Sequence, residues 1–234
     1  MEYTKSPYTS RMWQRMLSLP TYRHHIALWL FWIFPQILLV SVCNSRAMGE
    51  HSENSDIDLF IITKKGQLWT GRFLVTLISS LLGVRRKNTH GLTKWSLEYI
   101  KRTRNKFCLS FFITEDAMNL DSIRIENDMY LDKWIETLIP LVKKDKTLER
   151  FWAANSLGKS SEKKETKKSW FILYSLFFIL SWLEWIIRKL WLPHTLQTYK
   201  KLSKPWWVII SDTVLKFHDN DQRKVYRDSH NQAV

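Results

Sequence analysis

Cysteine is scarce in this chain: Cys43 and Cys108 are the only two among 234 residues. Both fall in apolar runs that predict buried strands, so the sequence lacks the disulfide framework on which small secreted domains depend. A reducing environment is therefore favoured, and we expect a cytoplasmic location. We also expect no signal peptide, because residues 1–20 are polar and mixed and contain no apolar core segment.

Long uninterrupted apolar runs are missing as well. A helix that crosses a bilayer needs about 20 predominantly apolar residues. The run at 26–42 is broken by Pro35, which predicts a helix, a break and then a buried strand. The run at 170–183 is followed by Glu184 and Arg188. We expect no spanning helix, and the second run predicts either a buried, groove-packing helix or a Trp-rich helix at a membrane interface.

Acidic residues are few relative to basic ones. The chain has 22 Asp and Glu against 36 Lys and Arg, a formal charge of +14. Such a surface attracts polyanions, whether nucleotides, nucleic acid or anionic lipid headgroups, although a merely basic soluble protein has the same composition. The hydrophobic content of 45% indicates a globular chain, and thirteen Trp residues supply large amphipathic surfaces to bury or to place at an interface.

Two aspartates two residues apart are the most informative feature of the sequence. Apolar residues alternate with Asp56 and Asp58 along 56–62, which predicts a strand with both carboxylates on one face. At a spacing of about 6–7 Å the two charges repel each other unless a cation lies between them. Hard divalent cations such as Mg²⁺ prefer oxygen ligands and substrate phosphates, so a metal–nucleotide complex would remove the conflict.

The residues before the pair complete a recognisable pattern. An apolar run at 37–43 predicts a strand, and a polar turn at Asn44 and Ser45 follows it. Together with Gly49 and the run Ser55-Asp-Ile-Asp-Leu, this turn resembles the signature of the polymerase-beta-type nucleotidyltransferase superfamily. In that signature a serine turn ends one strand and an Asp-x-Asp lies on the next. The resemblance covers roughly residues 37–63.

The resemblance implies an enzyme that transfers a nucleotide monophosphate to a hydroxyl. Asp56 and Asp58 would hold Mg²⁺, with two ions suspected, and the expected nucleoside triphosphate is ATP. A hydroxyl of a small molecule, a protein side chain or an RNA end would attack the α-phosphorus, and pyrophosphate would leave. The nucleotide-binding residues carried over are Asn44, Ser45, Gly49 and Ser55. Two alternatives stay open: a catalytically impaired nucleotide-binding protein, and a basic module that binds nucleic acid or makes a peripheral membrane contact.

Two departures from the family pattern support the first alternative. The family usually has glycine directly before the serine, where this chain has Asn44, although asparagine adopts left-handed backbone conformations readily. Many members also carry a third carboxylate on a later strand. The matching strand is predicted at 107–113, where the inward positions Cys108 and Ser110 are not acids.

The overall pattern predicts an α/β (α+β) fold, a mixed sheet flanked by helices. We expect a nucleotidyltransferase-like domain at 1–158, a charged linker at 159–168 and an aromatic-rich helical region at 169–234. Helices are predicted over 22–34, 68–82, 95–100, 128–139 and 170–192, and strands over 37–43, 56–62, 107–113 and 206–210. Strict alternation along 107–113 would place Phe107, Leu109 and Phe111 on one side of the strand, and Cys108, Ser110 and Phe112 on the other. The Gly66–Gly71 spacing imitates a phosphate-binding loop but lacks its Lys and Ser/Thr, so we assign it no such role.

Overall fold

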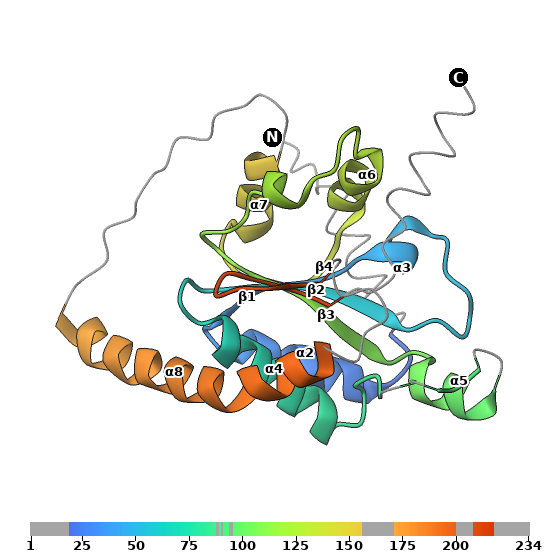
Figure 1. Cartoon of the computed structure of the whole chain (residues 1–234), viewed down its shortest axis with the longest axis horizontal. Coiled ribbons are helices and arrows are strands. Elements are labelled where there is room, and N and C mark those ends of the chain that lie inside the picture. Colours follow the sequence, from blue (N-terminus) through green and yellow to red (C-terminus); the bar gives the residue numbers. More distant parts are fainter. Residues whose placement is uncertain are drawn as a thin grey trace, which may run out of the picture.

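A six-stranded mixed sheet lies between two layers of helices (Figure 1). The structure is a computed structural model that describes residues 19–87, 89, 91–93, 96–155, 171–199 and 208–217, with backbone alone for 171–180, 198 and 199. The strand order is β4-β1-β2-β3-β6-β5, in which β2 and β3 are parallel and the other neighbours antiparallel. The strands are β1 (Ile37–Val42), β2 (Ile57–Thr63), β3 (Phe107–Thr114), β4 (Ile139–Lys143), β5 (Ile209–Ile210) and β6 (Val214–Lys216). This confirms the predicted α/β class.

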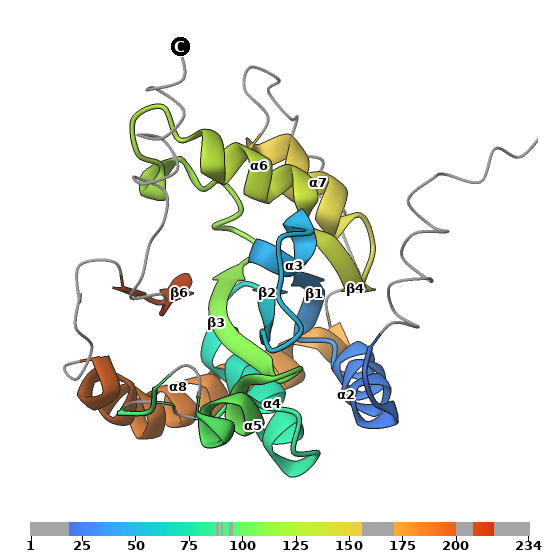
Figure 2. The same cartoon turned by 90° about the vertical axis from the view of Figure 1, so that its right-hand side faces the viewer.

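The helices divide between the two faces of the sheet (Figures 1 and 2). One layer contains α2 (Tyr22–Ile33), α4 (Leu68–Leu81) and α8 (Phe171–Tyr199). The other contains α6 (Met129–Thr137) and α7 (Thr147–Asn155). The short helix α3 (Asn44–Met48) contacts α6 and β2, and α5 (Leu97–Thr103) precedes β3. A single 3₁₀ turn, Asp121–Ile123, completes the described helical structure.

Alternation along β2 divides the interior into two cores. Leu59 and Ile61 pack with the α2–α4–α8 layer, whereas Phe60 and Ile62 pack with α6 and α7. Since side chains two residues apart point to the same face, Asp58 lies on the α6–α7 face. The candidate site is therefore built where that face meets the start of β2.

The predicted alternation along β3 is wrong beyond Leu109. Phe107, Leu109 and Phe112 belong to the core on the α2–α4–α8 side, and Phe111 belongs to the opposite core. The β2–β3 register explains the change, because Asp58 pairs with Cys108 and Phe60 pairs with Phe111. Three residues of β3 therefore match two of β2, and this bulge moves the later side chains to the other face.

The helix predicted over 128–139 is shorter than expected. It runs over Met129–Thr137, with the Asp128 carboxylate accepting the Leu131 N–H at 3.0 Å as an N-cap. Ile139 and Pro140 instead begin β4, which pairs with β1. Proline is tolerated there because β4 lies at the edge of the sheet and its register with β1 shifts next to Pro140.

The other predicted helices and strands are present in the described residues, although α5 and α8 end later than predicted, at Thr103 and Tyr199. Helix α4 ends before Gly83, whose φ of 67° makes it the expected left-handed residue after the helix. Helix α5 begins one residue after Ser96, which caps the Tyr99 N–H.

Gly71 lets α4 approach β2 closely, because a Cβ at this position would lie 2.5 Å from Thr63 Cγ2. This packing role accounts for Gly71 in the sequence that imitates a phosphate-binding loop.

The C-terminal region contributes to the same core as the rest of the chain. Helix α8 is longer than predicted and packs against α4, and β6 pairs with β3. The Glu184 carboxylate accepts the N–H groups of Trp69 and Thr70 at 2.7 Å each, so α8 caps the start of α4. The predicted linker 159–168 and the first part of the predicted strand 206–210 lie outside the described residues. No helix in the described ranges has the length and apolar character required to cross a bilayer.

Candidate metal and nucleotide site

The serine turn has the expected form despite its asparagine. Asn44 has a left-handed backbone (φ 56°) at the start of α3, and Gly49 (φ 81°) ends the helix with its N–H on the Ser45 carbonyl. The Asn44 Oδ1 accepts the Trp134 Nε1–H at 2.9 Å, which directs this side chain toward α6. The turn predicted from the sequence thus forms, and a contact with α6 holds its first residue.

The turn and the aspartate pair are neighbours in space. Cys43, the residue before the turn, donates its backbone N–H to the Asp58 carbonyl at 3.0 Å. On the other side of β2, the parallel register places Cys108 opposite Asp58. One ligand atom from each of Asp56, Asp58 and Cys108 lies within 4.8 Å of the others. Cys108 therefore lies beside both aspartates, on the strand where the family resemblance leads one to look for a third carboxylate.

A guanidinium group provides a cation beside the aspartate pair. Arg86 Nη1 lies 2.6 Å from Asp56 Oδ2 and 3.8 Å from Cys108 Sγ. The Arg86 backbone N–H donates to the Phe107 carbonyl at 2.9 Å, which fixes the arginine alongside β3. Sequence reasoning missed this residue. The only signal for it was the basic character of residues 84–106, which does not show which of the cations reaches the aspartates.

A second arginine ties α3 to the start of β2. Arg46 donates to the carbonyl oxygens of Asp56 at 3.1 Å and Ser55 at 3.2 Å, and to the side chain of Asn105. Asn105 in turn donates its N–H to the Ser55 carbonyl at 3.1 Å. The Ser55 hydroxyl donates to the Ser52 carbonyl at 2.6 Å, so it stabilises the loop that enters the strand. These contacts hold the backbone around Asp56 in place.

Burial and neighbouring charges shift the pKa values of the side chains in this cluster. The pKa of Asp56 is raised by burial and then by Asp58, and Arg86 offsets part of this rise. Burial, followed by the two aspartates, raises the pKa of the Cys108 thiol well above its ordinary value. Burial lowers the pKa of Arg86, but the attraction of Asp56 and Cys108 exceeds it and the net shift is upward. Ionisation of Asp56 and Cys108 is therefore disfavoured in this cluster, and a further cation would favour it.

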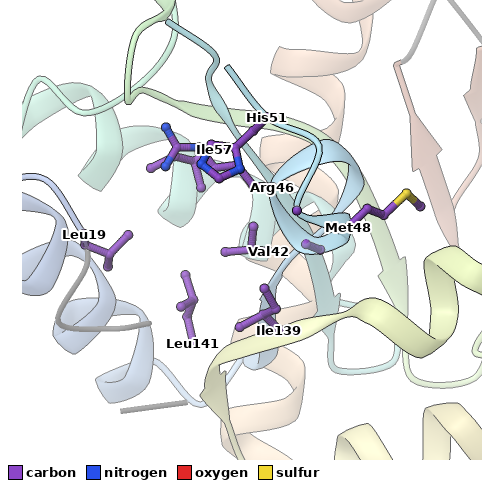
Figure 3. Close-up of a pocket in the computed structure, with 10 residues that line it drawn as sticks. Leu19, Val42, Arg46, Met48, His51, Ile57, Ile139 and Leu141 are labelled. Carbon is purple, nitrogen blue, oxygen red and sulfur yellow. The ribbon is translucent and has the colours of Figure 1, made fainter. Parts of the chain in front are cut away.

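A cavity of about 310 Å³ adjoins α3 (Figure 3). It is mainly apolar, with Arg46 and His51 as the polar side chains and Ile57, Val42 and Leu141 among the apolar ones. Asp56 and Asp58 do not line it. The cavity therefore lies beside the aspartate pair, and Arg46, Gly49 and Ile57 belong both to its lining and to the surroundings of the pair.

The cluster offers mixed donor atoms. Asp56 and Asp58, two residues apart, supply the carboxylate oxygens that hard divalent cations prefer, whereas Cys108 supplies sulfur, and the arginine paired with Asp56 shows that positive charge is accommodated there. Of the predicted residues, Asp56 and Asp58 lie together, while Asn44, Ser45 and Gly49 form the adjoining turn and Ser55 precedes the pair. Comparison with known protein families, curated proteins and solved structures finds no significant match to this chain.

Proposed function

We propose that this chain binds a nucleoside triphosphate with Mg²⁺ at Asp56 and Asp58 and transfers the nucleotide monophosphate to a hydroxyl acceptor. The single observation that carries the proposal is the convergence of the serine turn and the two carboxylates at the same end of β2. Bound Mg²⁺ would neutralise the carboxylates and the triphosphate and polarise the reacting phosphoryl group. A cytoplasmic location and ATP as the nucleotide remain predictions from the sequence.

The protein's own residues have distinct tasks in this proposal. Asp56 and Asp58 hold the cation, and the backbone N–H groups at the start of α3, with the Ser45 hydroxyl, face phosphate oxygens. Arg86 and Arg46 place positive charge beside the aspartates, where triphosphate oxygens would be attracted. In the transfer, the acceptor oxygen forms a bond to the α-phosphorus while the bond from that phosphorus to the pyrophosphate oxygen breaks. The acceptor proton leaves with the departing products or to solvent.

A second function is favoured by two specific observations. Arg86 already neutralises Asp56, and the third position holds a thiol with a raised pKa instead of a carboxylate. Both features weaken the site as a metal-dependent catalyst without removing its capacity to bind a triphosphate. A nucleotide-binding protein that does not turn its ligand over is therefore the alternative.

One experiment distinguishes the two functions. The full chain is incubated with α-labelled nucleoside triphosphates and Mg²⁺ in the presence of small-molecule, protein and RNA acceptors. Label transfer that is lost in Asp56→Asn and Asp58→Asn, and kept in the exposed-carboxylate control Glu53→Gln, supports the transferase. Calorimetric binding of Mg²⁺–ATP without transfer supports the binding protein. If neither binding nor transfer is detected, both proposals are refuted.

A further inference from the structure

Large apolar side chains are exposed on one side of the molecule. In the described part of the chain, twelve of fourteen exposed large apolar residues belong to α2, α4 and α8. Four of them are tryptophans: Trp29, Trp32, Trp182 and Trp185, with exposed fractions of 61, 58, 65 and 51%. We refer to the solvent side of these three helices as the outer helical face. Soluble monomers rarely leave so many large apolar side chains uncovered on one surface.

The three helices form a single layer. Helix α4 contacts α2 and α8, and all three lie on the same side of the sheet (Figure 1). Their inner sides are already used: Phe31 of α2, Val75 of α4 and Ile187 of α8 belong to the buried core. Helices α2 and α8 are therefore apolar on both sides, and an apolar outer side is typical of a helix that has a further layer to contact.

The charged side chains around this face are mainly basic, although Arg188 of α8 pairs with the exposed Asp212 at 2.9 Å. Within the sequences of α2, α4 and α8 the one acidic residue is Glu184, and its carboxylate faces inward to cap α4. Lys189 lies over the Trp185 ring with its Nζ 4.1 Å from the centroid, so a cation and an aromatic side chain are exposed together. In sequence, α8 is also flanked by basic segments: 159–168 contains five lysines and two glutamates, and Lys200, Lys201 and Lys204 follow the helix.

We propose that the outer helical face docks onto the surface of an anionic lipid bilayer. Tryptophan prefers the headgroup region, where its ring is partly apolar and its N–H stays hydrated. Lysine and arginine near the surface are attracted to acidic phospholipids, and aromatic and basic residues together are typical of interfacial helices. The contact is peripheral, because none of the described helices is suited to crossing the bilayer.

The positive charge of this chain favours an anionic bilayer over a second copy of the chain as the partner of the outer helical face. Two copies would each bring a formal charge of +14 and three helices whose one acidic side chain, Glu184, points inward, so association through this face would oppose like charges. An anionic bilayer supplies both the apolar phase and the negative charge that the face lacks. The proposal does not depend on the nucleotide site, because Asp58 lies on the opposite, α6–α7 side of the sheet.

Vesicle sedimentation of the full chain tests the proposal. We expect the protein to bind vesicles of phosphatidylcholine mixed with phosphatidylglycerol, to bind pure phosphatidylcholine much less, and to bind less as salt is raised. The double variant Trp29→Glu, Trp185→Glu should partition at least about tenfold more weakly, since two exposed apolar side chains that would enter the bilayer are lost. Met129→Glu is the matched control, because Met129 is 50% exposed but belongs to α6 on the other side of the sheet.

Tryptophan fluorescence of the wild-type chain tests the proposal without depending on whether a variant folds. Brominated lipids quench nearby tryptophans, so brominated anionic vesicles should quench the wild-type fluorescence more strongly than unbrominated ones. The proposal is overturned if the wild type does not bind anionic vesicles, or if the folded double variant binds them as tightly as the wild type does. It is also overturned if the wild type is a lipid-independent dimer that the double variant converts to a monomer, because the face would then join two copies.

Discussion

At the scale of single residues, Asp56 lies between one like charge and one unlike charge. Asp58 disfavours its ionisation, whereas the Arg86 guanidinium 2.6 Å away favours it. Arg86 is about one-third exposed, so this pair contributes modestly to the stability of the folded chain. Its larger effect is on the site, since any incoming cation has to compete with Arg86 for the Asp56 carboxylate.

The pKa of Asp56 should move in opposite directions when its two neighbours are removed. Asp58→Asn should lower it and Arg86→Met should raise it further, as measured by carboxyl NMR titration of the metal-free protein. Because this pKa is raised on folding, the stabilisation linked to Asp56 is full below its ordinary value of 3.8 and is lost as pH rises through the folded value. Arg102→Met, which removes the partner of Glu98, is the control. An Asp56 pKa that is insensitive to Arg86→Met would contradict the observed pair.

Cys108 offers a direct test of the third position. Cys108→Asp should tighten Mg²⁺ binding at least about tenfold, because the number of charged ligands strongly tunes divalent affinity. The same change should lower the melting temperature of the metal-free protein, since a third carboxylate adds repulsion, and Mg²⁺ should restore it. Cys108→Ser, which adds no charge, is the control for isothermal calorimetry and thermal melts. Equal Mg²⁺ affinities in the two variants would show that Cys108 lies outside the cation site.

At the scale of elements, local irregularities position the site. The bulge in β3 comes directly after Cys108, so Cys108 keeps its place opposite Asp58 while Phe111 turns into the α6–α7 core. Gly71 has a comparable effect in α4, because its missing side chain lets the helix approach the end of β2. In each case a single residue determines how two neighbouring elements pack: the extra residue sets the register of β3 against β2, and Gly71 sets the distance of α4 from β2.

Gly71→Ala should destabilise the fold by about 1–3 kcal/mol, because the added methyl overlaps Thr63 Cγ2. Adding Thr63→Ser should recover most of the loss, since serine removes Cγ2 and keeps the hydroxyl that donates to the Ile113 carbonyl. Urea unfolding of both single variants and the double variant gives the coupling energy. Additive losses would mean that the two side chains do not meet.

At the scale of the whole molecule, distant parts of the chain complete one sheet and one helical layer. Strand β6 covers the edge of β3, and α8 packs on α4 and caps its first turn. A fragment of residues 1–158 should therefore expose the edge of β3 and the apolar side of α4. We expect it to lose cooperative thermal unfolding by circular dichroism and to aggregate in size-exclusion chromatography. A monomeric fragment with a sharp transition would instead establish that residues 1–158 fold independently.

Much of the fold could be predicted because its signals are local. Apolar alternation, Gly83 after α4 and the turn at Asn44 each specify structure within a few residues of chain. The register of β3 could not be predicted, since an inserted residue is visible only against the partner strand. Strand β4 was missed because Pro140 is a common helix stop in sequence, and its tolerance in a strand depends on an edge position that only the sheet order establishes.

The candidate site likewise has parts that the sequence specifies locally and parts that depend on the tertiary structure. By itself the sequence determined the paired carboxylates, the serine turn and the helical apolar segments, because each depends on spacing along one short stretch. Only the tertiary structure decided what surrounds them: Arg86 beside Asp56, Cys108 beside both aspartates and four tryptophans on one outer face. These arrangements join residues tens of positions apart. They depend on strand register and helix packing, which arise from contacts across the whole folded chain.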